Sequence, residues 1–381
     1  MRPARARFVY AGVVATAAMH LWCSSDDDAA GVPGPDAGGD DAAPIDAGAE
    51  AEADAGAAEC SDAFCRVALP GVEALGLYGL HAKSASEIWL VGSRGFAARF
   101  DGAAWRPVPT GITAAIFGVT STSDGVVWGA SSGQAFLKLN GAPDGGAETV
   151  DGGFKGVVHA VGANGSEVFA VGRMFFDFSV GEPPSDNIWR YGAAPDGGGP
   201  EWRAVSPPCP MGEWEPECLE LRAVWVESAS RQWFAGDDGR VFRTDTSAAE
   251  PGDARIALAE MNSSSLRRLN GLWGFGANDV WAVGAQGVIR HYTGGDAWTP
   301  VASPVTEDLY GVWGSRPDDV WAVGDRGAVV HWDGRAWTVK DVPFPEENRP
   351  RLYAVAGAGG DVWVAGAGVL LRSARAAGGD R

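Results

Sequence analysis

Hydrophobic and polar residues alternate in short runs through residues 77–374, and the runs recur in a unit of roughly forty residues. The clearest copy reads LYGVWGSRPDDVWAVGDRGAVVHWDGRAWTVK, from Leu309 to Lys340, and Leu269 to Val301 repeats it almost in step. Inside that copy LYGVW, DVWAVG, GAVVHW and AWTVK each favour a strand. Turn residues separate them, notably Gly324 to Gly327 and Asp333-Gly334, where we expect glycine to supply positive φ.

One tryptophan anchors each copy, and its place can be followed through the chain. Equivalent to Trp321 are Trp89, Trp128, Phe169, Trp233, Trp281 and Trp363. An aliphatic residue precedes each anchor by eleven or twelve positions: Leu77, Ile116, Val157, Leu221, Leu269, Leu309 and Leu352. Glycine follows three positions later at Gly92, Gly172, Gly236, Gly284, Gly324 and Gly366, with Ser131 in the remaining copy. Four strands in each of seven copies predict an all-β, seven-bladed β-propeller.

The anchor ring has two possible uses, as core or as a platform for carbohydrate. Because the ring recurs in nearly every copy, packing between neighbouring blades is the favoured interpretation. A basic residue also recurs in the third strands, at Arg99, Arg190, Arg243, His291, His331 and Arg372. We expect these residues to pair with strand or turn acids instead of forming a ligand set. The turn pairs Asp237-Asp238 and Asp318-Asp319 are expected to be solvated.

The last copy ends near Arg372 after three strands, so its fourth strand must come from elsewhere. Residues 63–70, AFCRVALP, resemble the fourth strands AWRPVP and EWRAVSP. We therefore predict that the N-terminal strand completes the seventh blade and closes the ring. The propeller is expected to span residues 60–374, with residues 375–381 as a flexible tail.

The N-terminus has the pattern of an export signal. Three arginines precede an uncharged, mostly apolar stretch from Phe8 to Trp22, which is too short to span a bilayer. Cys23 follows in the context of a bacterial lipoprotein cleavage site, which predicts lipidation of Cys23 and a signal at residues 1–23. Simple secretion, with cleavage after Ala15-Thr16-Ala17, is the alternative. Either route predicts an extracytoplasmic protein, in the bacterial envelope or secreted.

Charge is distributed unevenly along the chain. The formal net charge is −19, and residues 24–62 hold twelve acidic side chains with no Lys or Arg. That composition predicts a disordered tether over residues 24–59. The body that follows keeps a net charge of −10 and shows no basic cluster, which argues against a nucleic-acid partner. Contact with a membrane is expected only through a lipid on Cys23.

The five cysteines fit an oxidising compartment. With Cys23 as the lipid carrier, four remain, and local pairing of Cys60 with Cys65 and of Cys209 with Cys218 is favoured among the three possible connectivities. A zinc site is the competing interpretation, but neither pair has the two-residue spacing or the neighbouring His of such sites. We expect no metal and no cofactor.

The order Trp-x-x-Gly strand, Gly-centred hairpin and Asp-Gly-x-x-Trp resembles the bacterial BNR and YVTN-like propellers of the WD40-like superfamily, including photosystem II stability-factor-like proteins. The resemblance covers most of residues 63–374. That family has an Asp-box hairpin between third and fourth strands, and here residues 101–105, 294–298 and 333–337 take its place. The boxes lack the family's Ser, so only the broad superfamily is implied. Nothing here implies photosynthesis.

No catalytic motif is recognisable, so the leading functional hypothesis is a non-enzymatic, monomeric scaffold that binds a protein or glycan. Loops that interrupt a rigid scaffold often carry function, and two expanded connections occur here, residues 173–187 and 206–220. Their aromatic side chains are the candidate binding patch: Met174, Phe175, Phe176, Phe178 and Trp214. These side chains could equally fold back on the propeller. A hydrolase or lyase with an axial active site, favoured by clustered Arg, Tyr and carboxylates there, and a structural envelope or assembly factor remain the alternatives.

Overall fold

The computed structural model describes residues 59–133, 135–142, 145–152, 156–174, 187–193, 198–206, 220–244 and 255–373. The chain divides into two units, Met1–Ile45 and Asp46–Arg381, and every described residue belongs to the second. The predicted signal, most of the predicted tether and the predicted tail therefore lie outside the described residues. The second unit contains the predicted propeller.

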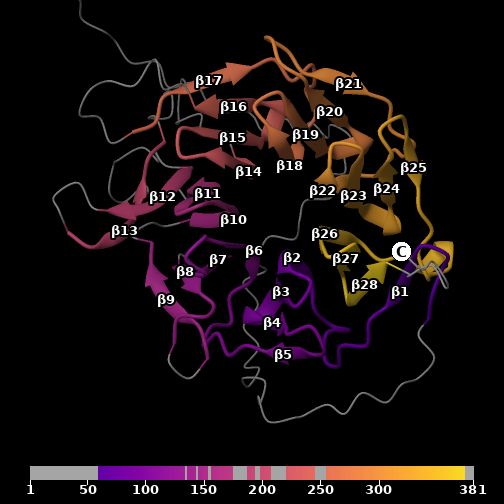
Figure 1. Cartoon of the computed structure of the whole chain (residues 1–381), viewed down its shortest axis with the longest axis horizontal. Helices are drawn as coiled ribbons and strands as arrows, with labels where there is room; N and C mark the ends of the chain where they lie inside the picture. The colour runs from indigo at the N-terminus through magenta and orange to yellow at the C-terminus, as the bar shows by residue number, and fades with distance from the viewer. Residues whose placement is uncertain are drawn as a thin grey trace, which may run out of the picture. The chain divides into compact units, whose positions relative to one another are not determined.

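Seven four-stranded antiparallel sheets are arranged as blades around one axis, which confirms the predicted propeller (Figure 1). Blades 1 to 3 are β2 (Leu77–Ser84), β3 (Glu87–Gly92), β4 (Ala97–Phe100), β5 (Trp105–Pro107); β6 (Ile116–Ser121), β7 (Val127–Ser131), β8 (Ala135–Lys138), β9 (Glu148–Asp151); and β10 (Gly156–Asn164), β11 (Glu167–Met174), β12 (Ile188–Ala193), β13 (Pro200–Ala204). Blades 4 and 5 are β14 (Leu221–Ser228), β15 (Arg231–Gly236), β16 (Val241–Thr244), β17 (Leu258–Met261); and β18 (Leu269–Gly276), β19 (Asp279–Gly284), β20 (Ile289–Tyr292), β21 (Thr299–Val301). Blades 6 and 7 are β22 (Leu309–Arg316), β23 (Asp319–Gly324), β24 (Val329–Trp332), β25 (Trp337–Val339); and β26 (Leu352–Ala358), β27 (Asp361–Gly366), β28 (Val369–Ser373), β1 (Phe64–Arg66).

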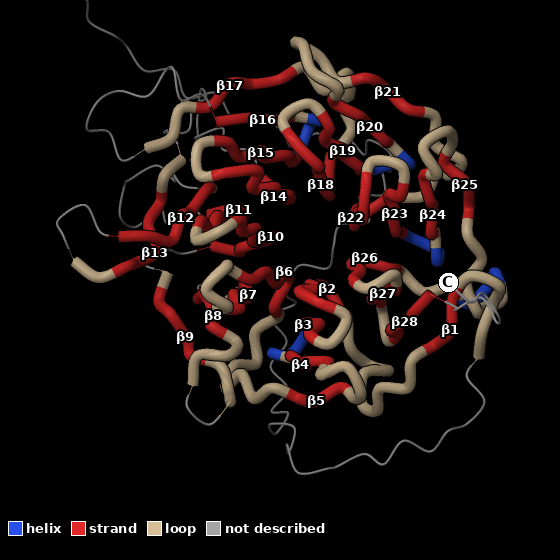
Figure 2. Tube along the Cα trace, in the orientation of Figure 1, coloured by secondary structure: helices blue, strands red, loops and turns tan. Residues whose placement is uncertain are grey.

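Helix among the described residues is confined to five three-residue 3₁₀ turns (Figure 2). Four of them connect second to third strands: η1 (Ser93–Gly95), η2 (Asp237–Gly239), η3 (Ala285–Gly287) and η4 (Asp325–Gly327). The fifth, η5 (Glu346–Asn348), lies between β25 and β26. The first strand of every blade lies nearest the axis, so the seven first strands surround the centre of the ring (Figure 1).

The anchor tryptophans pack between blades, as predicted. Trp281 of blade 5 is fully buried, and its ring centroid lies 5.3 Å from that of Trp332 and 5.4 Å from that of Trp337, both in blade 6. Trp233 of blade 4 meets Trp298 of blade 5 in the same way, at 5.6 Å. A four-stranded sheet cannot cover both of its faces alone, so each blade depends on the next for its core.

The ring is closed by the N-terminal strand, which confirms the prediction for residues 63–70. β1 pairs antiparallel with β28, with Phe64 opposite Ser373 and Arg66 opposite Leu371. Phe64 is fully buried and meets the anchor Trp321 of blade 6 edge-on at 5.8 Å. It therefore takes the place that tryptophan holds in other fourth strands. A disulfide joins Cys60 to Cys65, as the local pairing predicted.

The repeated glycine after each anchor has a different role from the one expected. Gly324 is extended, with φ −165°, so the expectation of positive φ is wrong there. A Cβ at Gly324 would lie 2.0 Å from the carbonyl oxygen of Asp308, so glycine is required by a close backbone approach. Positive φ occurs instead at Gly327 (+67°) and Gly334 (+88°). Blade 2, which carries the buried Ser131 at this place, has no 3₁₀ turn among its described residues.

One register assignment from the sequence is off by a residue. The aliphatic residues that begin the first strands pair with the anchor-plus-three position, as Leu77 does with Gly92. In blade 3 the residue paired with Gly172 is Val158, whereas Val157 pairs with Arg173. Val158 is fully buried and Val157 is not. The assignment of Val157 was wrong because β10 lacks a second register shift, which most other first strands have just before the hairpin to their second strand.

Five of the six third-strand basic residues pair with the acid at the start of the second strand, as expected, and Arg243 is the exception because its second strand begins with Arg231. Arg190 lies 2.8 Å from Glu167, and His331 lies 2.8 Å from Asp319. Each basic group also covers its anchor ring, and the His331 and Trp321 rings stack at 4.2 Å. Asp319 is therefore paired, so the expectation of a solvated turn acid holds for its neighbour Asp318 better than for Asp319 itself. These contacts give the repeated basic residues a structural role within the blades.

Candidate binding site at the propeller axis

Every first strand carries a β-bulge at the same point. In blade 1 the pairing skips from Leu77–Gly92 to Gly79–Val91, which leaves Tyr78 without a cross-strand partner. The same shift occurs in the other six first strands. A bulge turns one side chain away from the normal alternation of a strand. Since the first strands are the innermost, one side chain from each blade is available at the axis.

We call these seven side chains the axial ring. Its members are Tyr78, Phe117, His159, Arg222, Asn270, Tyr310 and Tyr353. All seven are half-buried. The residue after each bulge is always Gly or Ala, and a Cβ at Gly311 would lie 2.9 Å from the carbonyl oxygen of Tyr353 in the next blade. Small residues thus let adjacent first strands approach closely enough for the ring members to meet.

Aromatic rings form one half of the axial ring. Tyr78 contacts Phe117 of blade 2 at 5.2 Å between centroids and Tyr353 of blade 7 at 5.1 Å. Tyr353 continues to Tyr310 of blade 6 at 5.9 Å. Contacts with both neighbouring blades place the Tyr78 ring at the axis itself. We name Tyr310, Tyr353, Tyr78 and Phe117 the aromatic arc.

Charged groups form the other half, beginning beside Phe117. His159 Nε2 lies 2.7 Å from Glu220 Oε1. The Arg222 guanidinium lies 2.9 Å from Glu220 and 3.0 Å from Asp237. Arg173 lies 3.7 Å from the other oxygen of Glu220. Asp237 is thus an ion-pair partner and not the solvated turn acid expected from the sequence.

A second network of polar and charged groups lies in blades 5 to 7. Asn270 accepts a hydrogen bond from Arg268 at 3.1 Å and donates one to the carbonyl of Leu309 at 2.8 Å. Arg268 lies 3.4 Å from Asp308. The residues just before the four first strands therefore alternate in sign: Glu220, Arg268, Asp308 and Arg351. Opposite charges between neighbouring blades hold the backbone around the axis.

Asp325 joins the aromatic arc to this network. Its carboxylate accepts a hydrogen bond from the Tyr310 hydroxyl at 3.0 Å and another from Arg351. Burial and the nearby Asp325 charge raise the pKa of Tyr310, so the hydroxyl stays protonated and donates. Burial also raises the pKa of Tyr353. The tyrosines are therefore neutral, and the Arg351 and Asp325 charges cancel.

Glu220 is ionised in this setting. Burial alone would raise the pKa of its carboxyl, but contacts with His159, Arg222 and Arg173 outweigh burial and lower that pKa to about 2. A group with its pKa lowered on folding stabilises the fold above its unfolded pKa, near 4.5, and loses this contribution as the pH falls through the folded value. Glu220 thus serves at neutral pH as a fixed negative charge that fastens blades 3 and 4.

We predict that Glu220→Gln destabilises the protein at neutral pH, because it removes the carboxylate that Arg173 and Arg222 contact and leaves Arg222 paired with Asp237 alone. The difference in unfolding free energy between wild type and variant should shrink as the pH falls from 4.5 toward 2, where wild-type Glu220 becomes protonated too. Urea unfolding at several pH values measures this difference. Glu148→Gln serves as control, because Glu148 is half exposed beside Lys138. If the difference in unfolding free energy between wild type and Glu220→Gln did not change with pH, the charge of Glu220 would not be the cause of the destabilisation.

The patch predicted from the sequence lies almost wholly outside the described residues. Met174 ends β11, and nothing is described of its side chain. The other predicted members, Phe175, Phe176, Phe178 and Trp214, lie outside the described residues, as do Cys23, Cys209 and Cys218. The described ends of both expanded connections nevertheless lie beside the starts of first strands, on the face that bears the axial ring.

The axial ring was not identified from the sequence, although a signal exists. In each first strand an aliphatic residue precedes the bulge, a variable residue occupies it and a small one follows, as in Leu-Tyr-Gly at 77–79 and Leu-Arg-Ala at 221–223. The residues at the variable position are the members of the axial ring. Two of the described histidines lie outside the third strands, and one of them, His159, belongs to the ring. Burial lowers the pKa of the other, His81, to about 4, and its neutral ring contacts the Ser121 hydroxyl of blade 2 at 2.8 Å.

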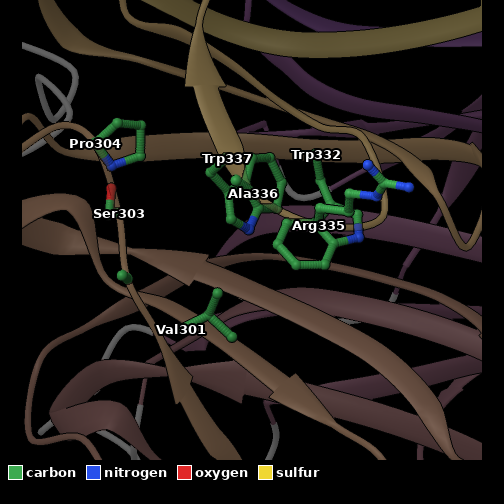
Figure 3. Close-up of a pocket in the computed structure, with 8 residues that line it drawn as sticks. Val301, Ser303, Pro304, Trp332, Arg335, Ala336 and Trp337 are labelled. Carbon is green, nitrogen blue, oxygen red and sulfur yellow. The ribbon is translucent and has the colours of Figure 1, made fainter.

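A groove lies on the outer rim between blades 5 and 6, away from the axial ring (Figure 3). It is lined by residues 301–304 on one side and by Trp332, Arg335 and Trp337 on the other. Trp337 is almost fully buried, and the rings of both tryptophans pack on Trp281. These rings are part of the core between blades, so the groove provides a control surface for experiments on the axis.

Two kinds of feature are absent from the described part of the chain. Among the residues with described positions, no three His, Cys, Asp or Glu side chains gather so as to hold a metal ion. In the same part of the chain, no helix has the length and apolar character needed to cross a membrane.

Comparison with known proteins gives the fold its context. No protein-family model matches the sequence, and no curated protein matches it. Among solved structures, YCF48 from Cyanidioschyzon merolae is similar at a TM-score of 0.59 and 18% identity, over 82% of this chain and 98% of that one. This similarity agrees with the β-propeller fold described above. YCF48 has also been solved bound to a D1 peptide, and that structure matches at a TM-score of 0.55 and 16% identity, over 82% of this chain and 95% of that one.

Propellers with other activities match this one equally well. Virginiamycin B lyase from Staphylococcus aureus gives a TM-score of 0.60 at 15% identity, over 81% of this chain and 98% of that one. The WD40 β-propeller domain of Doa1 gives 0.58 at 12% identity, over 82% and 96%. At these identities the similarity shows the fold alone, because one propeller fold supports many functions.

Proposed function

We propose that this chain is a non-catalytic protein-binding scaffold, that its partner contacts the axial ring, and that it acts outside the cytoplasm. The observation that carries the proposal is the bulge at one position of all seven first strands. A bulge leaves a backbone group unpaired and is retained where it aims a side chain. Seven repetitions aim seven side chains at one surface.

The composition of the ring supports a protein partner. Tyr and Arg are enriched among the residues that dominate binding energy at protein interfaces, and the ring holds three Tyr and one Arg. All seven members are half-buried, so their rings and methylene groups are already positioned and need little ordering on binding. The D1 peptide complex of YCF48 shows that a propeller of this fold can take a peptide partner.

Two features support a place outside the cytoplasm. The sequence begins with three arginines and an apolar stretch of secretory length. The Cys60–Cys65 disulfide fits an oxidising compartment, where such bonds persist. Lipidation of Cys23 would then attach the propeller to a membrane surface through an acidic tether.

A lyase or hydrolase is the second candidate, and a specific observation favours it. His159, Arg222, tyrosines and carboxylates gather around the axis, as an axial active site would require, and one fold neighbour is a lyase. However, the charged atoms face one another: Glu220 contacts two arginines and His159. With its pKa at about 2, Glu220 holds no proton to donate at neutral pH. We therefore favour binding over catalysis.

Site-specific photocrosslinking tests the proposal. The full chain is expressed with the photoreactive residue p-benzoyl-L-phenylalanine in place of Phe117, and separately in place of Trp332 in the outer groove, then irradiated with envelope extract. We expect a discrete protein adduct from the Phe117 position and none from the Trp332 position. Tyr78→Ala should reduce recovery of the same partner by about tenfold, as for a central interface residue.

The same experiment separates binding from catalysis. A scaffold returns its partner with unchanged mass, whereas a lyase or hydrolase yields a product of altered mass that disappears in His159→Ala. Equal adducts from the two positions, or recovery unaffected by Tyr78→Ala, would reject the axial ring as the binding surface.

A further inference from the structure

The aromatic arc is an uninterrupted row of aromatic rings on one half of the axis. Tyr310, Tyr353, Tyr78 and Phe117 follow one another through four consecutive blades, with centroids 5.9, 5.1 and 5.2 Å apart. Each ring is only half-buried. Aromatic faces carry negative electrostatic potential, which attracts cations at distances up to about 6 Å from the centroid.

The cationic groups beside the arc are already neutralised by carboxylates. Arg351 bonds to Asp325, Arg268 pairs with Asp308, and Arg222 pairs with both Glu220 and Asp237. An anionic ligand would have to compete with these carboxylates for each guanidinium. Two polar groups that a sugar could use, the Asn270 amide and the Tyr310 hydroxyl, are likewise already bonded within the protein.

A cation meets no such competition, and the structure contains a precedent. The guanidinium carbon of Arg351 lies 5.7 Å from the Tyr310 ring centroid, so the end of the arc already holds one cationic side chain. The same pairing recurs within blades, where the Arg372 guanidinium lies 4.9 Å from the Trp363 centroid. Cations on aromatic faces are therefore a stable arrangement throughout this fold.

The surrounding charge also favours a cationic ligand. The body beyond residue 62 has a net charge of −10. An acidic field of this kind raises the local concentration and the association rate of a positively charged partner.

We propose that the aromatic arc binds the side chain of a lysine or arginine presented by the partner protein. This inference rests on the proposed function and names the chemical group that the axial ring recognises. The cation would lie over Tyr353 and Tyr78, at the middle of the arc, while the acidic field draws the basic segment toward the axis.

Selection from a random peptide display library tests this inference on the full chain. Peptides retained by the wild type are sequenced, synthesised, and compared with versions in which each Lys or Arg is replaced by norleucine. Affinities are then measured for wild type, Tyr353→Leu, Tyr353→Phe and, as a matched aromatic control on the outer rim, Trp332→Leu. Tyr78→Leu provides a second arc variant if Tyr353→Leu does not fold.

We expect retained peptides to share a basic residue and its norleucine version to bind about three- to thirtyfold more weakly, the range of one cation–π contact. Tyr353→Leu should cause a similar loss, whereas Tyr353→Phe and Trp332→Leu should keep the affinity. If the retained peptides were neutral or acidic and bound the Leu variants more weakly than the wild type, the cationic preference would be overturned. The axial ring would still be the binding site in that case. Peptides indifferent to both arc variants would overturn the proposed function as well.

Discussion

Replacing Phe64 with alanine should destabilise the propeller by roughly 3–5 kcal/mol and lower its melting temperature by about 10 °C. The Phe64 ring is fully buried and packs edge-on against Trp321. It also lies in a three-residue strand that holds the two ends of the ring together through β28. The cavity left by alanine would therefore open at the one joint where the ring is not covalently continuous.

Calorimetry measures this effect, and Val339→Ala provides the control. Val339 ends the outer strand of blade 6 with its side chain about half exposed, so its truncation should change stability by less than about 0.5 kcal/mol. Deleting residues 60–70 removes the whole strand and should lower the melting temperature further still. A Phe64→Ala protein that melts with the wild type would show that β1 does not close the ring in solution.

Gly324→Ala should cost about 3 kcal/mol, a large effect for a single methyl group. The added Cβ would lie 2.0 Å from the carbonyl oxygen of Asp308 and 3.0 Å from Cα of Leu309. That backbone cannot retreat, because Asp325 donates a hydrogen bond to the same carbonyl at 2.8 Å and Leu309 is fully buried. The φ of Gly324 is accessible to any residue, so the penalty is steric and not conformational.

Gly276→Ala is the matched control, because it places the same methyl group at another glycine that ends a strand, here the first strand of blade 5. No atom lies within 4 Å of a Cβ at Gly276. The free energy of unfolding, measured by denaturant titration, should therefore fall strongly in Gly324→Ala and change by less than about 0.5 kcal/mol in Gly276→Ala. Equal midpoints for the two variants would contradict the close-approach explanation.

The fold was predictable because its determinants recur with the same residue types. Trp321 and its equivalents fill the same gap between blades, and the glycine three residues later meets the same carbonyl each time. Repetition of one residue type at one spacing is visible in a single sequence. Even Phe64 was recognisable, because its strand copies the pattern of the other fourth strands. Val158 was misplaced because one missing register shift is invisible in a row of valines.

The axial ring could not be found in the same way. Its position is occupied by Tyr, Phe, His, Arg or Asn, so no single residue type recurs. Strand residues normally alternate between the two faces of a sheet, and a bulge breaks that alternation without a marker such as proline. Tyr78 in a regular strand would face a neighbouring blade; only the shift after Leu77 directs it to the axis. The repeated small residue at Gly79 and its equivalents was the available clue.

The closing strand also has a consequence for biosynthesis. β1 is among the first parts of the propeller to leave the ribosome, whereas its partner β28 is the last. Six blades contain only neighbouring segments and can form as the chain emerges, but the seventh must wait for synthesis to end. During that interval β1 has no partner within its own chain and can pair with β28 of a completed chain nearby, so crowded chains risk exchanging this strand. Correct closure thus depends on each chain finding its own first strand before it meets another's.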